Sequence, residues 1–418
     1  MTLLLIISVL LVLTALFGII NERHLGLDPS IGLMLLALGM SLVLWGFNAA
    51  GIFDDVGWAE TVVRKLNLSN VLLNGVLCFM LFAGSAGVEF ASLEKEKWTI
   101  GTLAIGSTLI ACLLTGVLLH LALGWLGVSL GLSYALVFGA LISPTDPIAA
   151  LAILKSAGLP KRLETIINGE SLFNDGVGVV LFTVALAYAQ GSGQEGSPIT
   201  LFLREVLGGI GLGLGIGLTI HLTLLRTDSY ANQLLITLGG VSLGYSVALH
   251  IDVSGPIAMV VAGLVMGNVT APRLSKEVRE PLQTFWHGID EVLNSLLFVM
   301  IGLTVVVVHS LPFAPLIKTL PTAILVCLVA RAVSVYVPIT ALMATHRLEG
   351  DRSGLTKLLT WGGLRGGLAL ALALSLPESR DRPLIVNMTF AVVAFSVLVQ
   401  GSTIAKLFKP AYLKSLLK

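Results

Sequence analysis

The sequence predicts an all-α polytopic membrane protein with about thirteen transmembrane helices and inverted repeats, in which the fifth and twelfth helices are discontinuous and cross. Three observations support this fold class. The 418 residues are 56% hydrophobic and only 12% charged, whereas about a quarter of the residues in ordinary soluble domains are charged. Apolar segments of the length that crosses a bilayer, roughly 17 to 25 residues, recur along the chain. Two of these segments are interrupted near their middle by proline or glycine clusters that also carry a charge.

The apolar segments follow one another with short polar connections. The first lacks a basic start and a small-residue cleavage site, so we expect it to be retained as a span and not removed as a signal peptide. The ninth is short and begins at Gly255-Pro256. The expected spans are residues 3–20, 31–48, 70–90, 98–126, 131–156, 163–189, 199–225, 230–250, 255–268, 283–308, 318–345, 354–376 and 383–408.

Lysine and arginine are distributed unequally between the two sides of the expected membrane. Seventeen lie on the side that contains the C-terminus and six on the opposite side, while Arg331 and Arg365 lie inside spans. Cytoplasmic loops of membrane proteins are enriched in these residues. We therefore expect a cytoplasmic C-terminus and, with an odd number of spans, an N-terminus outside.

Charge and cysteine content exclude several classes of partner. The 25 basic and 24 acidic residues nearly cancel, so the chain has no basic surface for nucleic acid. Cys78, Cys112 and Cys327 all lie in apolar segments and have neither disulfide nor zinc spacing. We expect them to be small core residues, and we expect lipid to be the surrounding partner.

The two interrupted segments carry opposite charges. Pro144 and Pro147 in the fifth remove amide donors and disfavour helix at the residues before them. Four glycines between residues 361 and 367 relax the backbone of the twelfth. Each break exposes a partly positive and a partly negative helix end. Asp146 is placed to offset the positive ends, and Arg365 the negative ends.

Two interpretations of these breaks remain. The prolines could merely kink a helix, and the glycines could merely allow close packing, as small residues do in membranes. The breaks lie seven spans apart, however, so their segments cross the membrane in opposite directions. Interrupted helices at corresponding antiparallel positions are typical of inverted-repeat secondary transporters with a binding site at the midplane.

A polar motif, Gly169-Glu170-Ser171-Leu172-Phe173-Asn174-Asp175, lies in the middle of the sixth apolar segment. Each ionised group at that depth costs on the order of 3 kcal/mol. Ser171 and Asp175 share one helical face, while Glu170 and Asn174 share the adjacent one. A carboxylate buried there pairs with a cation or takes up a proton, and Arg331 in the eleventh span is the expected partner for one of them.

Four motifs occur in order along the chain: Thr145-Asp146-Pro147, the Gly169–Asp175 motif, and the segments around Arg331 and Arg365. This combination resembles the monovalent cation:proton antiporters, in particular the sodium/proton exchanger branch with an Asn-Asp pair, and the resemblance covers nearly the whole chain. It implies that Asp175 binds the ion and the proton, with Asn174 beside it. It further implies that Thr145, Asp146 and Ser171 contribute to the Na⁺ site, and that Glu170 forms a structural salt bridge with Arg331.

The resemblance also implies an assembly. We expect a homodimer in the inner cell membrane, with residues 1–90 and 229–308 as the dimerisation scaffold. Residues 98–190 and 318–408 would form the ion-transporting core bundle, and residues 199–225 the linking helix. The chain ends soon after its last span, so we expect the prokaryotic type without a long cytoplasmic tail. No cofactor is implied besides the transported ions.

Chemistry supports the same activity, because carboxylate, hydroxyl and carbonyl oxygens suit a hard cation. We expect Na⁺, with Li⁺ as a second substrate, to compete with H⁺ at Asp175, and an electroneutral exchange because Asn174 cannot ionise. The alternatives are a K⁺/H⁺ antiporter, a cation channel, and a membrane-embedded enzyme using Glu170 and Asp175 as acid and base. The enzyme alternative lacks a histidine-rich metal set or a Ser/Lys nucleophile.

Some polar or small residues have two interpretations. Glu89 would lie at the membrane interface or pair in the core. The glycines between residues 208 and 217 would form a flexible linker or allow close packing. A last group in the tenth span would line a cytoplasmic funnel or form a network at a subunit interface; it comprises Asp290, Glu291, Asn294 and Ser295.

Overall fold

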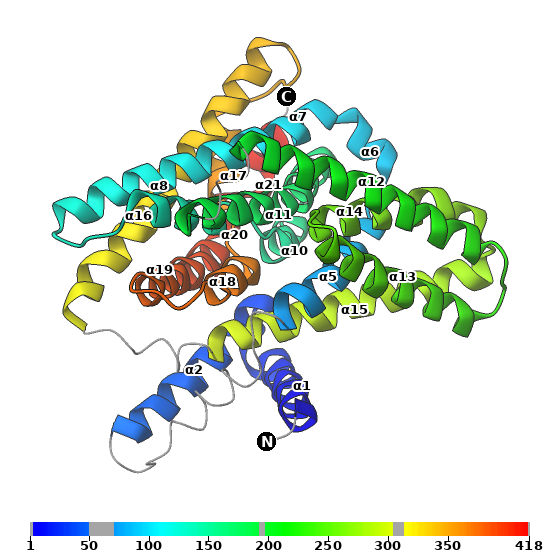
Figure 1. Cartoon of the computed structure of the whole chain (residues 1–418), viewed down its shortest axis with the longest axis horizontal. Coiled ribbons are helices and arrows are strands. Elements are labelled where there is room, and N and C mark those ends of the chain that lie inside the picture. The colour runs from blue at the N-terminus through cyan, green and yellow to red at the C-terminus, as the bar shows by residue number, and fades with distance from the viewer. Residues whose placement is uncertain (1–2, 50–70, 192–196, 304–312, 417–418) are drawn as a thin grey trace.

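The computed structural model describes residues 3–49, 71–191, 197–303 and 313–416, and all regular elements in these ranges are helices (Figure 1). Nine of the described helices are long and apolar enough to cross a membrane, and Val71–Ala86 and Leu132–Ile142 are shorter apolar helices. The predicted all-α membrane class is confirmed. Parts of the third and tenth expected spans, residue 70 and residues 304–308, lie outside the described residues, as do Arg64 and Lys65.

The first part of the chain forms two long helices and then a series of shorter ones. α7 and α8 are joined through a π-helical turn, Thr102–Ser107, into one long helix. The elements are α1 (Leu3–Ile20), α2 (Pro29–Ala49), α5 (Leu77–Ala86), α6 (Phe90–Lys95), α7 (Lys97–Gly101) and α8 (Thr108–Trp125), with π-turns at Asn21–Leu25 and Val71–Val76.

The middle of the chain contains the first interrupted span and the long helix with the polar motif. The elements are α9 (Leu132–Ile142), α10 (Ile148–Ser156), α11 (Lys161–Ala189), α12 (Pro198–Leu224), α13 (Tyr230–His250), α14 (Gly255–Val265) and α15 (Lys276–Leu303). A π-turn, Met266–Thr270, and a 3₁₀ turn, Ala271–Arg273, follow α14.

The last part of the chain contains the second interrupted span. Its elements are α16 (Phe313–Ala344), α17 (Arg352–Trp361), α18 (Gly367–Leu374), α19 (Arg382–Phe395), a π-turn at Ser396–Gly401, α20 (Ser402–Leu407) and α21 (Pro410–Ser415).

Two expected boundaries are wrong. α15 begins at Lys276 and not at residue 283, because its first two turns are polar and a search for apolar segments detects only the apolar part of a helix. The third span ends at Ala86 and not at residue 90, since the chain turns at Gly87 and starts α6 at Phe90.

Side-chain caps define several helix starts. Ser197 accepts a hydrogen bond from the amide of Ile199, and Ser254 accepts one from that of Ile257. Each of these two serines is followed by a proline in the first helical turn, where a missing amide is harmless. The Asp351 carboxylate caps α17 in the same way. The starts of α12, α14 and α17 are therefore encoded by local residues.

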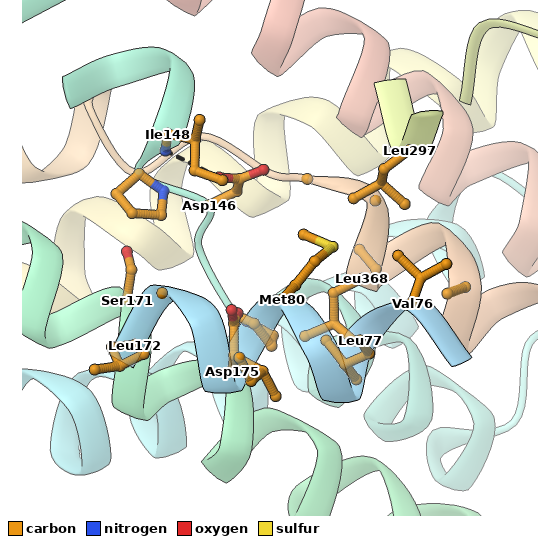
Figure 2. Close-up of a pocket in the computed structure, with 18 of the residues that line it drawn as sticks. Val76, Leu77, Met80, Asp146, Ile148, Ser171, Leu172, Asp175, Leu297 and Leu368 are labelled. Atoms are coloured by element: carbon orange, nitrogen blue, oxygen red, sulfur yellow. Dashed lines mark hydrogen bonds between the residues drawn. The ribbon is translucent and has the colours of Figure 1, made fainter. Parts of the chain in front are cut away.

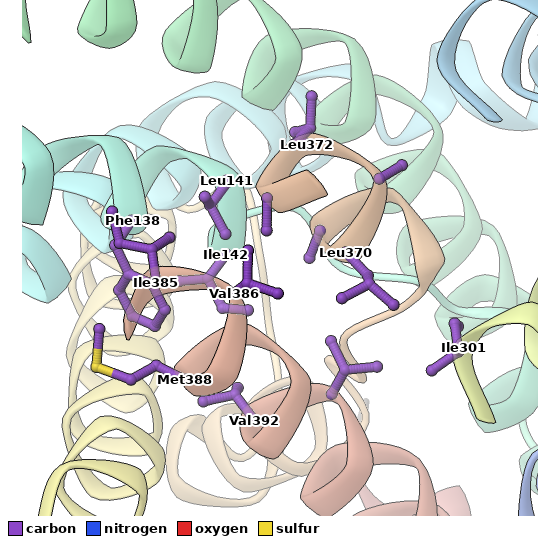
Figure 3. Packing of buried hydrophobic residues seen from close by; sticks show 14 of the residues in the cluster. Phe138, Leu141, Ile142, Ile301, Leu370, Leu372, Ile385, Val386, Met388 and Val392 are labelled. Carbon is purple, nitrogen blue, oxygen red and sulfur yellow. The ribbon is translucent and has the colours of Figure 1, made fainter. Parts of the chain in front are cut away.

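The core consists of large apolar side chains between interrupted and continuous helices. Phe138, Leu141 and Ile142 of α9 are fully buried and belong to the same apolar cluster as Leu370 of α18 and Ile385 of α19 (Figure 3). One half-helix of each break, α9 and α18, is therefore packed in this apolar cluster, while the other halves, α10 and α17, contribute to a second cluster.

Three glycines of α12, Gly209, Gly213 and Gly217, face α14 and the residue before it, whereas Gly211 and Gly215 have nothing within 4 Å of an added Cβ atom. A Cβ atom added at Gly209 would lie 2.7 Å from the carbonyl oxygen of Ser254, and one at Gly213 would lie 2.5 Å from that of Ala258. Real Cβ atoms do not approach backbone this closely, so only glycine permits the contact. Of the two interpretations of this glycine run, the contacts support close packing.

Candidate ion-binding site

The two breaks meet at one point. The chain leaves helical geometry between Ile142 and Ile148, and again between Trp361 and Gly367. The amide of Asp146 donates a hydrogen bond of 2.8 Å to the carbonyl of Leu364, which forms an isolated antiparallel bridge between the breaks. The interrupted spans therefore cross and are joined backbone to backbone.

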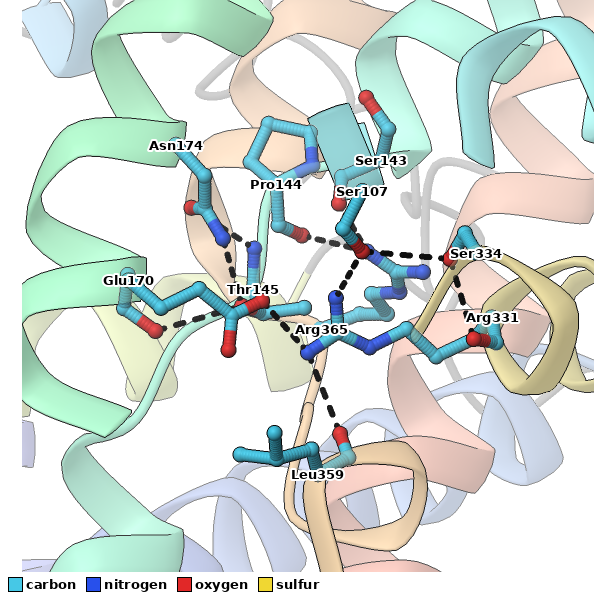
Figure 4. Close-up of polar contacts among 11 residues, drawn as sticks. Ser107, Ser143, Pro144, Thr145, Glu170, Asn174, Arg331, Ser334, Leu359 and Arg365 are labelled. Carbon is cyan, nitrogen blue, oxygen red and sulfur yellow. Dashed lines mark hydrogen bonds and ion pairs between the residues drawn. The ribbon is translucent and has the colours of Figure 1, made fainter. Parts of the chain in front are cut away.

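Each charge in the crossing lies beside a helix end of opposite sign. The Asp146 carboxylate accepts a hydrogen bond of 3.0 Å from the amide of Ile148, at the positive start of α10. The Arg365 guanidinium donates to the carbonyls of Ser143 and Pro144, the latter at 2.8 Å, beyond the negative end of α9 (Figure 4). These contacts provide hydrogen-bond partners for the backbone amide of Ile148 and the carbonyls of Ser143 and Pro144, which have no partner within a helix at the break.

One face of the α11 motif forms a buried ion pair. A Glu170 carboxylate oxygen lies 2.8 Å from Nη2 of Arg331, and the two side chains are 2% and 4% exposed. The same guanidinium donates to the carbonyl of Leu359 at 3.1 Å and to Oγ of Ser107 at 3.3 Å (Figure 4). Arg331 therefore ties α11 and α16 to α17 and to the π-turn before α8.

The Asn174 amide holds the first break. Its Nδ2 donates to Oγ1 of Thr145 at 2.8 Å, and its Oδ1 accepts from the backbone amide of Thr145 at 3.2 Å. The Oγ atoms of Thr145 and Ser171 are 3.2 Å apart. Thr145 therefore contacts both polar faces of α11, through Ser171 on one and Asn174 on the other.

A cavity of about 140 Å³ lies beside the crossing. Asp146, Ser171 and Asp175 line it, together with apolar side chains from α5, α15 and α18 (Figure 2). The charges of Asp146 and Asp175 interact. Carboxylate and hydroxyl oxygens are donors that suit a hard cation, so the cavity combines such donors with a largely apolar wall.

The expected ligand residues separate into two groups. Asp175, Asp146 and Ser171 reach the cavity, whereas Thr145 and Asn174 are buried and do not line it. The hydrogen-bonding capacity of these two side chains is used between them and with Ser171. In this conformation they hold the break in place directly behind the cavity wall.

Sequence reasoning missed Asn168, which lines the cavity one turn before Ser171. Its spacing of three and seven residues from Ser171 and Asp175 is the helical signal that could have found it. Asp290 lines the cavity from α15, while its neighbour Glu291 is exposed. Glu89 is exposed and accepts a hydrogen bond from Ser92, so it lies at the surface.

Asp28 is a second residue that the sequence did not single out. It lies in the connection before α2, and its charge reaches Asp146. Burial raises the pKa of the Asp28 carboxyl above its ordinary value, although the amide of Ser30 donates a hydrogen bond to it at 3.1 Å. Asp28 does not line the cavity.

Crossed, discontinuous membrane helices with carboxylates beside the crossing define a secondary transporter. The transmembrane sodium/hydrogen exchanger family matches residues 11–409 of this chain. The chain therefore belongs to the sodium/hydrogen exchanger family, within the monovalent cation:proton antiporters. This finding confirms the resemblance seen in the sequence, and it makes the protein a transporter and not an enzyme.

Individual relatives align with this chain along nearly its full length. The chain is 40% identical over 415 residues to the Na(+)/H(+) antiporter NhaP of Pseudomonas aeruginosa, with 97% of this chain and 96% of the relative covered. It is 33% identical over 412 residues to the Na(+)/H(+) antiporter NhaH of Halobacillus dabanensis, with 96% and 97% covered. The fold is similar to that of the sodium proton antiporter MjNhaP1 from Methanocaldococcus jannaschii, with a TM-score of 0.77 over all of both chains at 20% identity.

Proposed function

We propose that the protein exchanges Na⁺ for H⁺ across a cell membrane. The observation that carries this proposal is the position of Asp175, an ionisable group that lines a cavity beside the crossed breaks with Asp146 and Ser171. Membership of the sodium/hydrogen exchanger family and the Na(+)/H(+) antiport activity of its relatives NhaP and NhaH support Na⁺ as the cation. They favour Na⁺ over the K⁺ alternative. Transport of Li⁺ as a second substrate is our proposal.

Exchange follows from competition at one carboxylate. Asp175 holds either a proton on an oxygen atom or a cation against the same oxygen, and Asp146 and Ser171 supply further oxygen donors. An ionised, empty site is costly to move past an apolar wall. If only the protonated or cation-loaded site crosses, each Na⁺ that moves one way requires a proton to move the other way.

The exchange is electroneutral in this proposal. Asn174 cannot ionise, and both ends of its amide are bonded to Thr145, so it neither carries a second proton nor adds charge. The test is proteoliposome exchange under an imposed membrane potential. Turnover should be the same at zero and at large potential, and turnover that follows the potential would contradict electroneutrality.

Alternating access is proposed to occur between two units. One wall of the cavity comes from α5 and α15, within the scaffold ranges 1–90 and 229–308. The facing wall comes from α10, α11 and α18, within the core ranges 98–190 and 318–408. A shift of the core against the scaffold would move the site while the linking helix, residues 199–225, spans the two units.

The cellular setting is also part of the proposal. The distribution of lysine and arginine supports an inner membrane protein with its N-terminus outside and its C-terminus in the cytoplasm. We propose a homodimer that contacts through the scaffold, and a contribution to pH homeostasis through exchange of protons for sodium.

The deciding experiment compares the native protein with Asp175→Asn in everted membrane vesicles. Addition of Na⁺ or Li⁺ should release protons from vesicles with the native protein and not from those with the variant, while K⁺ should have little effect. Glu89→Gln is the matched control, because it also neutralises one carboxylate but lies at the surface. Full activity of Asp175→Asn would refute the role of this residue. Flux that continues without a counter-ion would indicate a channel.

A further inference from the structure

The polar lining of the cavity is concentrated toward one end. On α11, Asn168, Ser171 and Asp175 line it from a single helical face. Asn168 comes seven residues before Asp175, which is about 10 Å along a helix axis. On α15 the lining changes over a similar length, from Asp290 to the apolar Leu297.

α11 and α15 begin on the same side of the membrane, because they are the sixth and tenth spans. This side also holds the C-terminus and most of the lysine and arginine residues in the connections, so it is the cytoplasmic side in our proposal. The cavity is therefore polar toward the cytoplasm, at Asn168 and Asp290. It is apolar in the opposite direction, where Leu72, Leu73 and Leu297 line it.

The Asp290 carboxylate is held in place. Nδ2 of Asn294, one turn later on α15, donates to an Asp290 carboxylate oxygen at 3.0 Å and to the Asp290 carbonyl at 2.8 Å. Asn294 is only 6% exposed. The charge of Asp290 interacts with that of Asp146. Both carboxylates therefore contribute to the negative electrostatic potential in the cavity.

Within the described part of the chain, the lining of the cavity carries only negative charge, and the one opposing charge close to Asp290 is that of His287, which lies outside the lining. Among the described residues that line the cavity, none is lysine, arginine or histidine. Asp28, in the connection on the same side, adds a further negative charge near Asp146. A cavity lined by one sign of charge with low-dielectric walls raises the local concentration of the opposite ion.

We propose that Asn168 and Asp290 form an outer tier that receives Na⁺ on the cytoplasmic side before it reaches Asp175. Asp290 attracts the hydrated ion, and the Asn168 side-chain carbonyl replaces one of its water ligands. The ion then moves two helical turns inward to Asp175, Ser171 and Asp146. This inference rests on the proposed Na⁺/H⁺ exchange and adds to it a first binding step.

The experiment measures Na⁺ dependence of exchange in everted vesicles, where the cytoplasmic side faces the medium. Asp290→Asn should raise the KM for Na⁺ about fivefold, since it removes one of the charges that concentrate the cation, and leave the maximal rate close to native. Asn168→Leu should raise KM in the same direction. Glu291→Gln is the matched control, since it neutralises the next residue of α15, whose exposed carboxylate pairs with His287 and lies outside the cavity lining. Its KM should change far less than that of Asp290→Asn.

Ionic strength separates an electrostatic role from a structural one. Choline chloride at about 1 M shortens the screening length to about 3 Å, so it should bring the KM of the native protein toward that of Asp290→Asn. A purely structural defect would keep the KM difference. Equal KM values for Asp290→Asn and Glu291→Gln, or a loss of maximal rate at native KM, would overturn the outer tier.

A binding measurement keeps this test independent of transport. Na⁺ should raise the unfolding temperature of the detergent-solubilised native protein, and Asp290→Asn should need about fivefold more Na⁺ for half of the shift. If the native protein shows neither flux nor a thermal shift with Na⁺, both the proposed function and the outer tier fail. If it shows them and Asp290→Asn matches Glu291→Gln, only the outer tier fails.

Discussion

Glu170 and Arg331 show what one buried ion pair does for this fold. Both side chains are almost fully removed from solvent, and Arg331 also bonds Ser107 and the backbone of Leu359. Burying a pair is only weakly favourable, but removing one partner leaves an uncompensated charge in a medium that solvates it poorly. The pair therefore makes the positions of four chain segments depend on one another.

We expect Glu170→Gln and Arg331→Ala each to lower the free energy of unfolding by about 3 to 5 kcal/mol, because each leaves the remaining charge unpaired. Thermal unfolding in detergent measures this loss apart from transport. The double variant Glu170→Leu with Arg331→Leu is the control, and it should recover part of the loss. A Glu170→Gln protein as stable as native would contradict the role assigned to the pair.

Competition at Asp175 predicts a specific pH dependence. At pH values where Asp175 is mostly protonated, each further unit of acidification should raise the KM for Na⁺ by about tenfold, because one proton must leave for each cation bound. The maximal rate should stay constant over the same range. Vesicle exchange measured at several Na⁺ concentrations and pH values checks this. A maximal rate that falls at constant KM would indicate that proton and cation bind at separate groups.

At the scale of elements, α12 and α14 pack through glycine. Gly213→Ala would place a methyl group 2.5 Å from the Ala258 carbonyl, whereas Gly211 has nothing within 4 Å of an added Cβ. We expect Gly213→Ala to lower the free energy of unfolding by about 1 to 3 kcal/mol through overpacking. Gly211→Ala should be neutral or stabilising by up to about 1 kcal/mol. Thermal unfolding of the two variants tests this, and equal stability would refute the close contact.

The sequence predicts the breaks well because proline and glycine act locally. Pro144, Pro147 and the glycines after Trp361 interrupt helices whatever surrounds them, and the charges within the breaks follow from helix-end electrostatics. The contact between Asp146 and Leu364 could not be predicted in detail, since it joins residues more than 200 positions apart. Its register depends on how α9 and α18 pack against α19.

The cavity lining was harder to predict for the same reason. Asp175 and Ser171 are evident from their cost in an apolar segment, but Asn168 lies near the start of α11, where polar residues are common. Asp290 could not be separated from Glu291 by composition. Only the rotation of α15 about its axis, which is set by packing against α2 and α5, decides which of the two faces the cavity.

At the scale of the whole molecule, the distribution of basic residues predicts orientation. In the proposed orientation, with a cytoplasmic C-terminus, a green fluorescent protein fused after Lys418 should fluoresce and alkaline phosphatase fused there should be inactive. Alkaline phosphatase fused after Val128, beyond the fourth span, should be active. The reverse pattern would invert the topology and place the outer tier on the external side.

The hydrogen bond between the two breaks has a mechanical consequence. Asp146 and Leu364 join the interrupted spans, and Asn174 joins the first of them to α11. While these hydrogen bonds hold, the coordinating atoms cannot move apart from one another. The binding site should therefore move as a rigid body. The work done against the membrane potential in each transport step is then set by the total charge of the site residues and the bound ion together, and not by the charge of the ion alone.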